Sequence, residues 1–229
     1  MSETTADANE REPAQPAGPL AGRCPRSWLL FLTLTALLTA ADLVTKHLAF
    51  ERISDHPVVV NKQDAIELMR SQPQALNALI PPHDPYVVAP HLLEFKLVLN
   101  PGAVFGTGPG NRWFFVGFTI VALIVAVVMF ARATGARQWL THTGIALIVS
   151  GGLGNLYDRL VFACVRDFIH PLPGVTWPGS TREVWPYVSN VADAFLLIGI
   201  AIVMAKLWRH ERAIVQAQKA AKADQTASG

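Results

Sequence analysis

Three aspartates and two asparagines lie in one stretch of a chain that is otherwise mostly apolar. The stretch that begins at Ser150 contains Asn155, Asp158, Asp167, Asn190 and Asp193. Ionisable side chains at membrane depth are costly, so such residues are functional candidates by default. Two carboxylates a few ångströms apart cannot both ionise easily, and the proton that they share leaves one base and one acid. We predict that Asp167 and Asp193, which flank the same loop, meet in this way and activate water.

Most of these residues also have a simpler, structural interpretation. Asn190 and Asp193 have the spacing of a capping box at the start of a helix. Asp158 and Arg159 can pair with each other, or contact other polar groups, and so close the end of a helix. Asp167 is harder to explain in this way, because the run around it, CVRDFI, is too apolar for a solvated loop. The sequence does not say which aspartate of the predicted dyad carries the proton.

No other group in the sequence competes for a catalytic role. No Ser or Cys has an evident base partner, and no Cys or His pair has the spacing of a zinc site. We therefore expect no metal and no cofactor. The two cysteines, Cys24 and Cys164, fall on opposite sides of the membrane in the predicted topology, so we expect no disulfide.

The composition is that of an integral membrane protein. Of the 229 residues, 51% are hydrophobic and only 16% are charged. The net charge of +2 is mild, and no basic stripe alternates with aromatic residues. Nucleic acid is therefore not an expected partner.

Four apolar segments are long enough to span a membrane as helices. They run from Trp28 to about Phe50, from Trp113 to Ala131, from Trp139 to about Leu160 and from about Val188 to Leu207. Arg and Lys gather before the first segment, between the second and third, and after the fourth. The positive-inside rule places that side in the cytoplasm. The predicted fold is an all-α integral membrane protein with four transmembrane helices, a small extracytoplasmic β-containing segment and both termini cytoplasmic.

The first apolar segment has an alternative interpretation as a cleaved signal peptide, which also places basic residues before an apolar run. The later segments, and the pair of Asp42 and Lys46 on one helix face, favour a retained helix. The pair either belongs to a functional site or is an intrahelical ion pair that makes insertion tolerable, with Lys46 extending to the interface.

The predicted organisation is one membrane domain between two tails. Residues 1–27 are polar and lack periodicity, which predicts a disordered cytoplasmic tail. Residues 28–207 form the membrane domain, with extracytoplasmic segments at 51–112 and 161–187, and residues 208–229 form a polar cytoplasmic tail. In the first outer segment we expect a short helix at 64–69, a half-buried strand at 93–99 and a turn at 100–106.

Five short motifs follow one another in a specific order. They read Asp42-Leu-Val-Thr45-Lys46, Asn100-Pro-Gly102-Ala103-Val-Phe105, Gly154-Asn155-Leu-Tyr-Asp158-Arg159, Val165-Arg-Asp167-Phe168 and Ser189-Asn190-Val-Ala192-Asp193. In this order the chain resembles the lipoprotein signal peptidases (signal peptidase II), which are four-helix inner-membrane aspartic peptidases of bacteria. The resemblance covers the core from Trp28 to about Leu207.

The resemblance implies a site. The family's two catalytic aspartates correspond to Asp167 and Asp193. Its supporting polar residues correspond to Asp42, Lys46, Asn100, Gly102, Asn155, Asp158, Arg159 and Asn190. In that case Asn155, Arg159 and Asn190 orient backbone and carboxylates, and Asn100 and Gly102 hold the substrate peptide in extended form.

The resemblance also implies a reaction and its place. The expected activity is removal of the signal peptide from diacylglyceryl-modified prolipoproteins, by cleavage before the lipidated cysteine. It takes place at the extracytoplasmic face of the bacterial cytoplasmic (inner) membrane, in a multi-pass protein that we expect to be a monomer. The expected partners are that substrate and membrane lipid, with helices two to four leaving an apolar cleft for the acyl chains.

Three positions depart from the family pattern. Arg166 replaces an apolar residue beside Asp167, Ser189 replaces an aromatic residue and Val104 replaces a small alanine. None of these changes removes a carboxylate of the predicted dyad.

Both outer segments are also longer than is usual in the family. The resemblance implies that the first segment forms a small sheet that cradles substrate and that the second acts as a lid over the dyad. The second contains Trp177 and Trp185 together with several Gly and Pro residues. Its length puts expectations about loop motion that come from the family in doubt.

A different class of function is a small ion-coupled membrane carrier, with Asp42, Lys46 and Asp193 as a proton relay. Carriers place such groups near the midplane and often show internal repeats with broken helices. Here the carboxylates gather near the outer ends of the helices, and no repeat is visible. The five motifs favour the peptidase.

Overall fold

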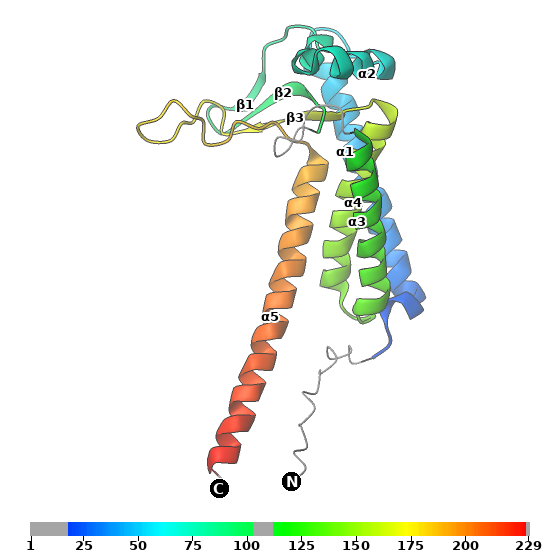
Figure 1. Ribbon diagram of the computed structural model, residues 1–229, viewed down its shortest axis with the longest axis vertical. Coiled ribbons are helices and arrows are strands. Elements are labelled where there is room, and N and C mark those ends of the chain that lie inside the picture. Colours follow the sequence, from blue (N-terminus) through cyan, green and yellow to red (C-terminus); the bar gives the residue numbers. More distant parts are fainter. Residues whose placement is uncertain (1–17, 103–111, 228–229) are drawn as a thin grey trace, which may run out of the picture.

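The computed structural model describes residues 18–102 and 112–227, and four long helices dominate it (Figure 1). They are α1 (Pro25–Arg52), α3 (Arg112–Ala133), α4 (Trp139–Val161) and α5 (Val191–Ala227). Among the described helices, α1, α3 and the Val191–Lys219 part of α5 are long and apolar enough to cross a membrane. The more polar α4 is not in this group. The structure therefore shows three clear apolar spans out of the four predicted.

α4 forms the centre of the bundle, because α1, α3 and α5 all pack against it. Its contact with α5 depends on small residues. A methyl group on Gly151 would collide with the carbonyl oxygen of Ala192, and one on Gly199 would lie 2.6 Å from the carbonyl oxygen of Gly144. Side chains of this size let two helix backbones approach closely.

A small antiparallel sheet covers one end of the bundle (Figure 1). Its strands are β1 (Tyr86–Ala89), β2 (Leu93–Asn100) and β3 (Val165–Pro171), in the order β1-β2-β3. β2 confirms the strand predicted at 93–99, whereas β1 and β3 were not predicted. The helix α2 (Lys62–Ser71) lies at the same end of the molecule and contains the short helix predicted at 64–69.

Two apolar clusters hold the bundle and the sheet together. Under the sheet, Phe50, Leu99 and Phe168 are buried in one cluster. Nearer the other end, Phe31 stacks on Phe130 with ring centroids 4.2 Å apart. On α1, the polar pair Asp42 and Lys46 lies between these two clusters, since it falls between Phe31 and Phe50 in the sequence.

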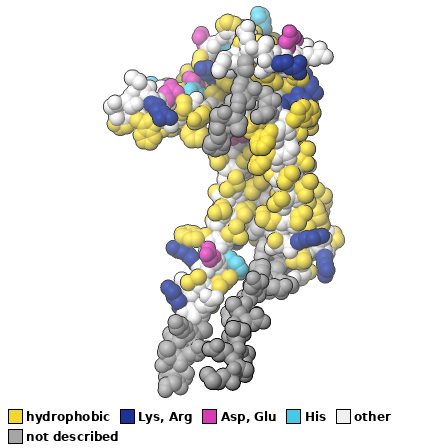
Figure 2. All heavy atoms as spheres, viewed as in Figure 1, with side chains coloured by type: hydrophobic (Ala, Val, Ile, Leu, Met, Phe, Trp, Pro, Cys, Tyr) yellow, Lys and Arg dark blue, Asp and Glu magenta, His cyan; other side chains and the backbone are white. Residues whose placement is uncertain are grey.

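The surface of the bundle is that of a membrane protein (Figure 2). On the face shown, hydrophobic side chains cover the shaft of helices, and Lys and Arg side chains lie beyond both ends of this apolar surface. We call this surface the apolar band. Charged groups on either side of such a band are typical of a helix bundle that sits in a bilayer.

The N-terminal tail differs from the prediction where it is described. Residues 18–27 are ordered: the Ala21 N–H donates to the carbonyl oxygen of Thr134 at 2.9 Å, and α1 begins at Pro25. Residues 1–17 lie outside the described residues. After Leu207, α5 continues without a break to Ala227, because the Ala, Lys and Gln residues of this segment are strong helix formers.

Candidate active site

The first turn of α5 fixes Asp193 through a capping box. Asp193 Oδ2 accepts a hydrogen bond from the Asn190 backbone N–H at 3.2 Å, and Asn190 Oδ1 accepts one from the Asp193 N–H at 3.1 Å. This confirms the predicted cap. Asp193 Oδ1 faces α4, where Asn155 Nδ2 donates to it at 2.8 Å. The cap and the site are thus one arrangement and not alternatives.

β3 brings Asp167 back over the helix bundle. The strand pairs with β2 so that Asp167 lies opposite Val98, and the residue is buried, with 1% of its surface exposed. The backbone N–H groups of Phe168 and Ile169 both donate to the carbonyl oxygen of Ser189 at 2.8 Å. These bonds tie β3 to the start of α5, so residues far apart in the sequence come together.

Three asparagine amides join the two carboxylates. Asn190 Nδ2 donates to Asp167 Oδ1 at 2.6 Å and to Asn155 Oδ1 at 3.1 Å. Asn100 Nδ2, at the end of β2, donates to the other Asp167 oxygen at 3.0 Å. We call Asn100, Asn155 and Asn190 the amide network. Asp167 and Asp193 are thus connected through it, and neither forms an ion pair with another described residue.

Burial, together with the nearby charge of Asp193, raises the pKa of Asp167 to about 7. Loss of water around a carboxyl group disfavours its ionised form, and so does a like charge. The amides of Asn100 and Asn190 oppose this rise, because their hydrogen bonds stabilise the ionised form. At neutral pH Asp167 is therefore protonated far more often than an ordinary aspartate.

A second group of carboxylates lies next to the amide network and is paired with cations. Lys46 Nζ lies 2.9 Å from Asp42 Oδ2 and 3.6 Å from Asp158 Oδ2, and Arg166 Nη2 lies 2.8 Å from Asp158 Oδ1. We call these four residues the charged cluster. Asp42, Lys46 and Asp158 are fully buried, and Arg166 is 7% exposed. Two negative and two positive side chains give the cluster no net charge.

The charged cluster also holds the framework of the amide network. Asp42 Oδ1 accepts a hydrogen bond from the backbone N–H of Ala192 in the first turn of α5, at 2.8 Å. Lys46 Nζ donates to Asn155 Oδ1 at 2.9 Å. Both contacts cross between helices, so α1 fixes the start of α5 and the amide of Asn155.

Asp158 and Arg159 do not pair with each other and instead contact other polar groups, which is the second of the two predicted alternatives. The partner of Asp158 is Arg166, whose backbone N–H also donates to Asp158 Oδ2 at 3.0 Å. Arg159 instead donates to the carbonyl oxygen of Asn155 at 3.2 Å, and its guanidinium lies 5.4 Å from the centre of the Phe115 ring. The physical reason is the return of β3, which carries Arg166 back against the end of α4.

Arg166 was missed as a site residue, because Arg159 is nearer to Asp158 in the sequence and carries the same charge. Asp42 and Asp158 are both buried, and Lys46 compensates only one of them. Buried charges are normally paired, so a second cation was needed. The departure of Arg166 from the family pattern therefore has a structural explanation in this chain.

In this structure Gly102 orients the amide of Asn100, and that amide contacts Asp167. Gly102 has φ of +88°, and a Cβ there would lie 2.9 Å from the Phe115 ring, so a side chain does not fit. The Gly102 N–H donates to Asn100 Oδ1 at 2.9 Å, which leaves Asn100 Nδ2 free to face Asp167. Residues 103–105 of the same motif, including Val104, lie outside the described residues.

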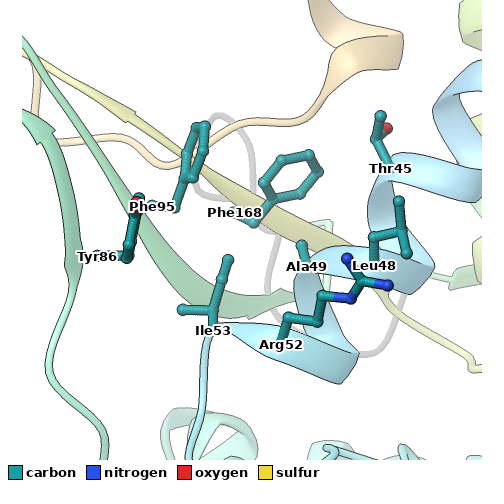
Figure 3. Close-up of a pocket in the computed structure, with 8 residues that line it drawn as sticks. All are labelled: Thr45, Leu48, Ala49, Arg52, Ile53, Tyr86, Phe95 and Phe168. Atoms are coloured by element: carbon teal, nitrogen blue, oxygen red, sulfur yellow. The ribbon is translucent and has the colours of Figure 1, made fainter.

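An apolar pocket of about 350 Å³ lies between α1 and the sheet (Figure 3). It is lined by Thr45, Leu48, Ala49, Arg52, Ile53, Tyr86, Phe95 and Phe168. Phe168 follows Asp167 on β3, so their side chains leave the strand on opposite faces. The pocket is formed by α1 and the sheet and not by helices two to four, among which the acyl chains were expected.

The carboxylates of the described residues are not arranged around a metal. Within residues 18–102 and 112–227, no group of three or more His, Cys, Asp or Glu side chains could hold a metal ion. The partners of Asp167 and Asp193 are the amides described above.

The sequence matches a family model described as "Signal peptidase (SPase) II" over residues 34–209. The chain is 34% identical to a "Lipoprotein signal peptidase" of Desulfitobacterium hafniense (strain DSM 10664 / DCB-2) over 126 residues, which cover 55% of this chain and 75% of that protein. It is 29% identical to a protein of the same name from Anaeromyxobacter sp. (strain Fw109-5) over 187 residues, covering 77% and 83%.

The fold is also similar to that of a solved bacterial membrane enzyme, determined by the in meso method at 1.9 Å resolution. The TM-score is 0.55 at 23% identity, and the match covers 77% of this chain and 91% of the other. At this identity the likeness concerns the fold alone.

Proposed function

The chain belongs to the signal peptidase II family, and from this premise we propose that Asp167 and Asp193 are its catalytic dyad. The protein is a lipoprotein signal peptidase, an aspartic peptidase that lies in a membrane. The observation that carries the dyad is the amide network, which joins Asp167 to Asp193 through Asn190 and Asn155. Carboxylates without a paired cation are free to exchange protons with water and substrate.

The two aspartates have environments that support different roles. Asp167 is buried and its pKa is raised to about 7, so it supplies the proton and acts as the acid. Asp193 lies in the first turn of α5 and accepts hydrogen bonds from Asn155 and Asn190. The helix dipole favours a negative charge at this position, so Asp193 acts as the base.

In the proposed reaction a water molecule attacks the carbonyl carbon of the scissile peptide bond. Asp193 accepts one proton from the water as the new C–O bond forms, and Asp167 donates its proton to the carbonyl oxygen. The tetrahedral intermediate then collapses: Asp167 takes its proton back from the oxygen, and Asp193 passes its proton to the leaving nitrogen as the C–N bond breaks. The dyad returns to its starting state, with one carboxylate product and one amine product.

The proposed substrate is a diacylglyceryl-modified prolipoprotein, cleaved before its lipidated cysteine. The name shared by the relatives supports a lipoprotein substrate. The position of the site also supports it, because Asp193 lies in the first turn of the apolar helix α5. A cysteine held in the bilayer by its lipid would reach a dyad at this level. Asn100, Gly102 and Arg159 border the dyad and are the residues that we propose to position the peptide.

We propose that α4 is the fourth span and that the sheet lies outside the cytoplasm. α4 has 23 residues, about 35 Å of helix, which is enough for a core about 30 Å thick. Its polar side chains are enclosed by the three apolar helices, which lowers the cost of placing them in a bilayer. The Arg and Lys distribution supports cytoplasmic termini in a bacterial inner membrane. A monomer suffices, since one chain contributes every residue of the proposed site.

The ion-coupled carrier is less well supported. Lys46 contacts Asp42 directly, but it reaches Asp193 only through the amide of Asn155. An amide in a fixed orientation does not pass a proton along, and Lys46 is held between two carboxylates.

The test is a gel-shift cleavage assay in detergent with a diacylglyceryl-modified prolipoprotein. We expect the wild-type protein to cleave it in the presence of a chelator and Asp193→Asn to show no cleavage. The amide oxygen introduced by this change can still accept the capping hydrogen bond, so the variant should stay folded. Cleavage by folded Asp193→Asn, or loss of wild-type cleavage on chelation, would rule out the dyad mechanism.

A further inference from the structure

The segment between β3 and α5 forms a projecting arm. Residues 172–188 extend sideways from the sheet, away from the bundle (Figure 1). The arm doubles back on itself: the Val184 N–H donates to the carbonyl oxygen of Val175 at 2.8 Å, and the Trp177 N–H donates to that of Arg182 at 3.1 Å. It is therefore a hydrogen-bonded hairpin with a definite shape. We call it the aromatic arm.

Both ends of the aromatic arm are attached to the strand that carries Asp167 or to its neighbour. At one end, the Leu172 N–H donates to the carbonyl oxygen of Leu92 at 2.9 Å. At the other end, the Ser189 N–H donates to the carbonyl oxygen of Ile169 at 2.8 Å. A force that holds the arm at a given height therefore also holds β3 at that height.

The arm carries large aromatic side chains that are exposed in the part of the chain that the structure describes. Trp177 is 55% exposed, Trp185 is 40% exposed and Tyr187 is 68% exposed. Trp185 and Tyr187 contact each other edge to face at 6.2 Å, but much of both rings remains uncovered. Apolar surface gathered in this way on a short projecting hairpin marks an interaction site.

The position of the arm indicates what covers these rings. Tyr187 lies just before Val191, where the apolar span of α5 begins, so the root of the arm is at the edge of the apolar band. In Figure 2 the hydrophobic side chains of the projecting part lie along its edge nearest the apolar band, and charged side chains lie above them. Trp and Tyr side chains are enriched at this level in membrane proteins, because one part of the ring is apolar and another is polar.

We infer that the aromatic arm lies on the leaflet at the sheet side of the membrane, with Trp177, Trp185 and Tyr187 inserted among the lipid headgroups. The partner is the phospholipid interface, which is continuous with the apolar band. A consequence, which rests on the proposed function, is that the arm sets the height of Asp167 above the leaflet. The lipidated cysteine of a substrate would be anchored in that same leaflet.

The test uses the fluorescence of the two arm tryptophans in lipid nanodiscs. The emission of Trp177→Phe/Trp185→Phe is subtracted from that of the wild type, which leaves the contribution of these two indoles. Nanodiscs made with phospholipids brominated near the headgroup are compared with unbrominated ones, and iodide serves as the quencher in water. We expect bromine to remove most of the difference emission and iodide to remove little of it.

Two results would overturn the inference. Quenching by iodide without quenching by bromine would mean that the arm stands in water. Protection from both quenchers would mean that protein covers the arm, either a second copy of this chain or another segment. Cleavage by the same samples is measured separately, so failure of the proposed reaction and failure of the arm's membrane contact are distinguishable.

A second measurement does not depend on the variant's folding. Hydroxyl-radical footprinting of the wild-type protein in nanodiscs gives the oxidation of Trp177 and Trp185 relative to His56, which is exposed in the segment after α1. We expect both tryptophans to be protected compared with the same residues in the unfolded chain. Oxidation of the tryptophans to the unfolded level would contradict the inference.

Discussion

The amide network and the charged cluster surround buried aspartates with different kinds of partner. Asp42 and Asp158 are buried against Lys46 and Arg166, whereas Asp167 and Asp193 are held by asparagines. In the charged cluster each carboxylate lies beside a cation. A carboxylate that is held only by amides, beside another carboxylate, keeps a proton that it can exchange.

Under the proposed function, this difference separates the structural aspartates from the catalytic ones without reference to sequence motifs. Removing one member of a buried ion pair leaves an uncompensated charge, which costs stability. Replacing a proton-exchanging carboxylate by an amide preserves shape and hydrogen bonding but removes the chemistry. The same Asp→Asn change should therefore mainly lower stability in the charged cluster and mainly lower activity at Asp167 and Asp193.

The largest expected effect is that of Asp167→Asn on cleavage. Loss of the acid should lower the rate per folded molecule by about a thousandfold or more, since positioned acid and base groups contribute about 10²–10⁴-fold each. The thermal midpoint should change little, because the amide introduced by this change can keep one of the two contacts with its asparagine neighbours. Gel-shift cleavage and thermal unfolding of the same sample measure both quantities. If Asp167→Asn keeps its activity within tenfold of the wild type, Asp167 is not the acid and the proposed difference between the two regions is wrong.

The matched change in the charged cluster is Asp158→Asn. It leaves the buried Arg166 without its carboxylate, so we expect a loss of roughly 3–5 kcal/mol of stability. Cleavage per folded molecule should stay within about tenfold of the wild type, because Asp158 exchanges no proton in the reaction. Unfolding in a mild denaturing detergent, with cleavage normalised to folded protein, gives the two values. An unchanged unfolding midpoint would show that the ion pair is not needed.

A double variant sharpens this result. Asp158→Leu/Arg166→Met removes both charges and fills a similar volume, and replacement of a whole buried pair is often neutral or stabilising. We expect it to recover most of the stability lost in Asp158→Asn. Lys46 then keeps Asp42 as its partner. If the double variant is less stable than the single one, the pair contributes through its hydrogen bonds and not through charge compensation.

The pH dependence of cleavage should follow Asp167. Its pKa is raised to about 7, so the acid loses its proton above that pH and the rate should fall roughly tenfold per pH unit. Folding has the same sign: the folded state binds this proton more tightly than the unfolded state, so the proton's stabilising effect is lost as pH rises through about 7. A pH–rate profile of the wild type and Asp158→Asn should show the same alkaline limb. If the alkaline limb moves in Asp158→Asn, the titrating group lies in the charged cluster and its assignment to Asp167 is wrong.

The smallest expected effect is a shift of that limb in Asn100→Ala. The Asn100 amide lowers the pKa of Asp167 by stabilising its ionised form. Its removal should raise that pKa and move the alkaline limb to higher pH, with a loss of about tenfold in rate from poorer positioning. The comparison variant is Asn77→Ala, which removes an amide that contacts the backbone of β2 at Leu99. A limb that moves equally in both variants would mean that the sheet as a whole is disturbed.

Much of the fold could be predicted because membrane helices leave strong signals. Length and lack of charge mark the spans at α1, α3 and α5. The capping box at Asn190 and Asp193 could also be predicted, because it depends on local spacing.

The contacts that could not be predicted depend on β3, because this strand brings the chain back over the helix bundle. The strand is short and mixed, with Arg166, Asp167 and His170 among apolar residues, so it lacks the alternation of β2. Without β3, Arg166 has no evident path back to Asp158, and the nearer Arg159 is the obvious partner. The turn between α4 and β3 brings Arg166 and Asp158 together.

The most direct test of the division between the two regions is infrared spectroscopy of the protonated carboxyl group. We predict a carboxylic-acid carbonyl band in the wild-type protein that disappears with a midpoint near pH 7. The band should be absent in Asp167→Asn and present in Asp158→Asn. A band that persists in Asp167→Asn and is lost in Asp158→Asn would place the exchangeable proton in the charged cluster and contradict the account.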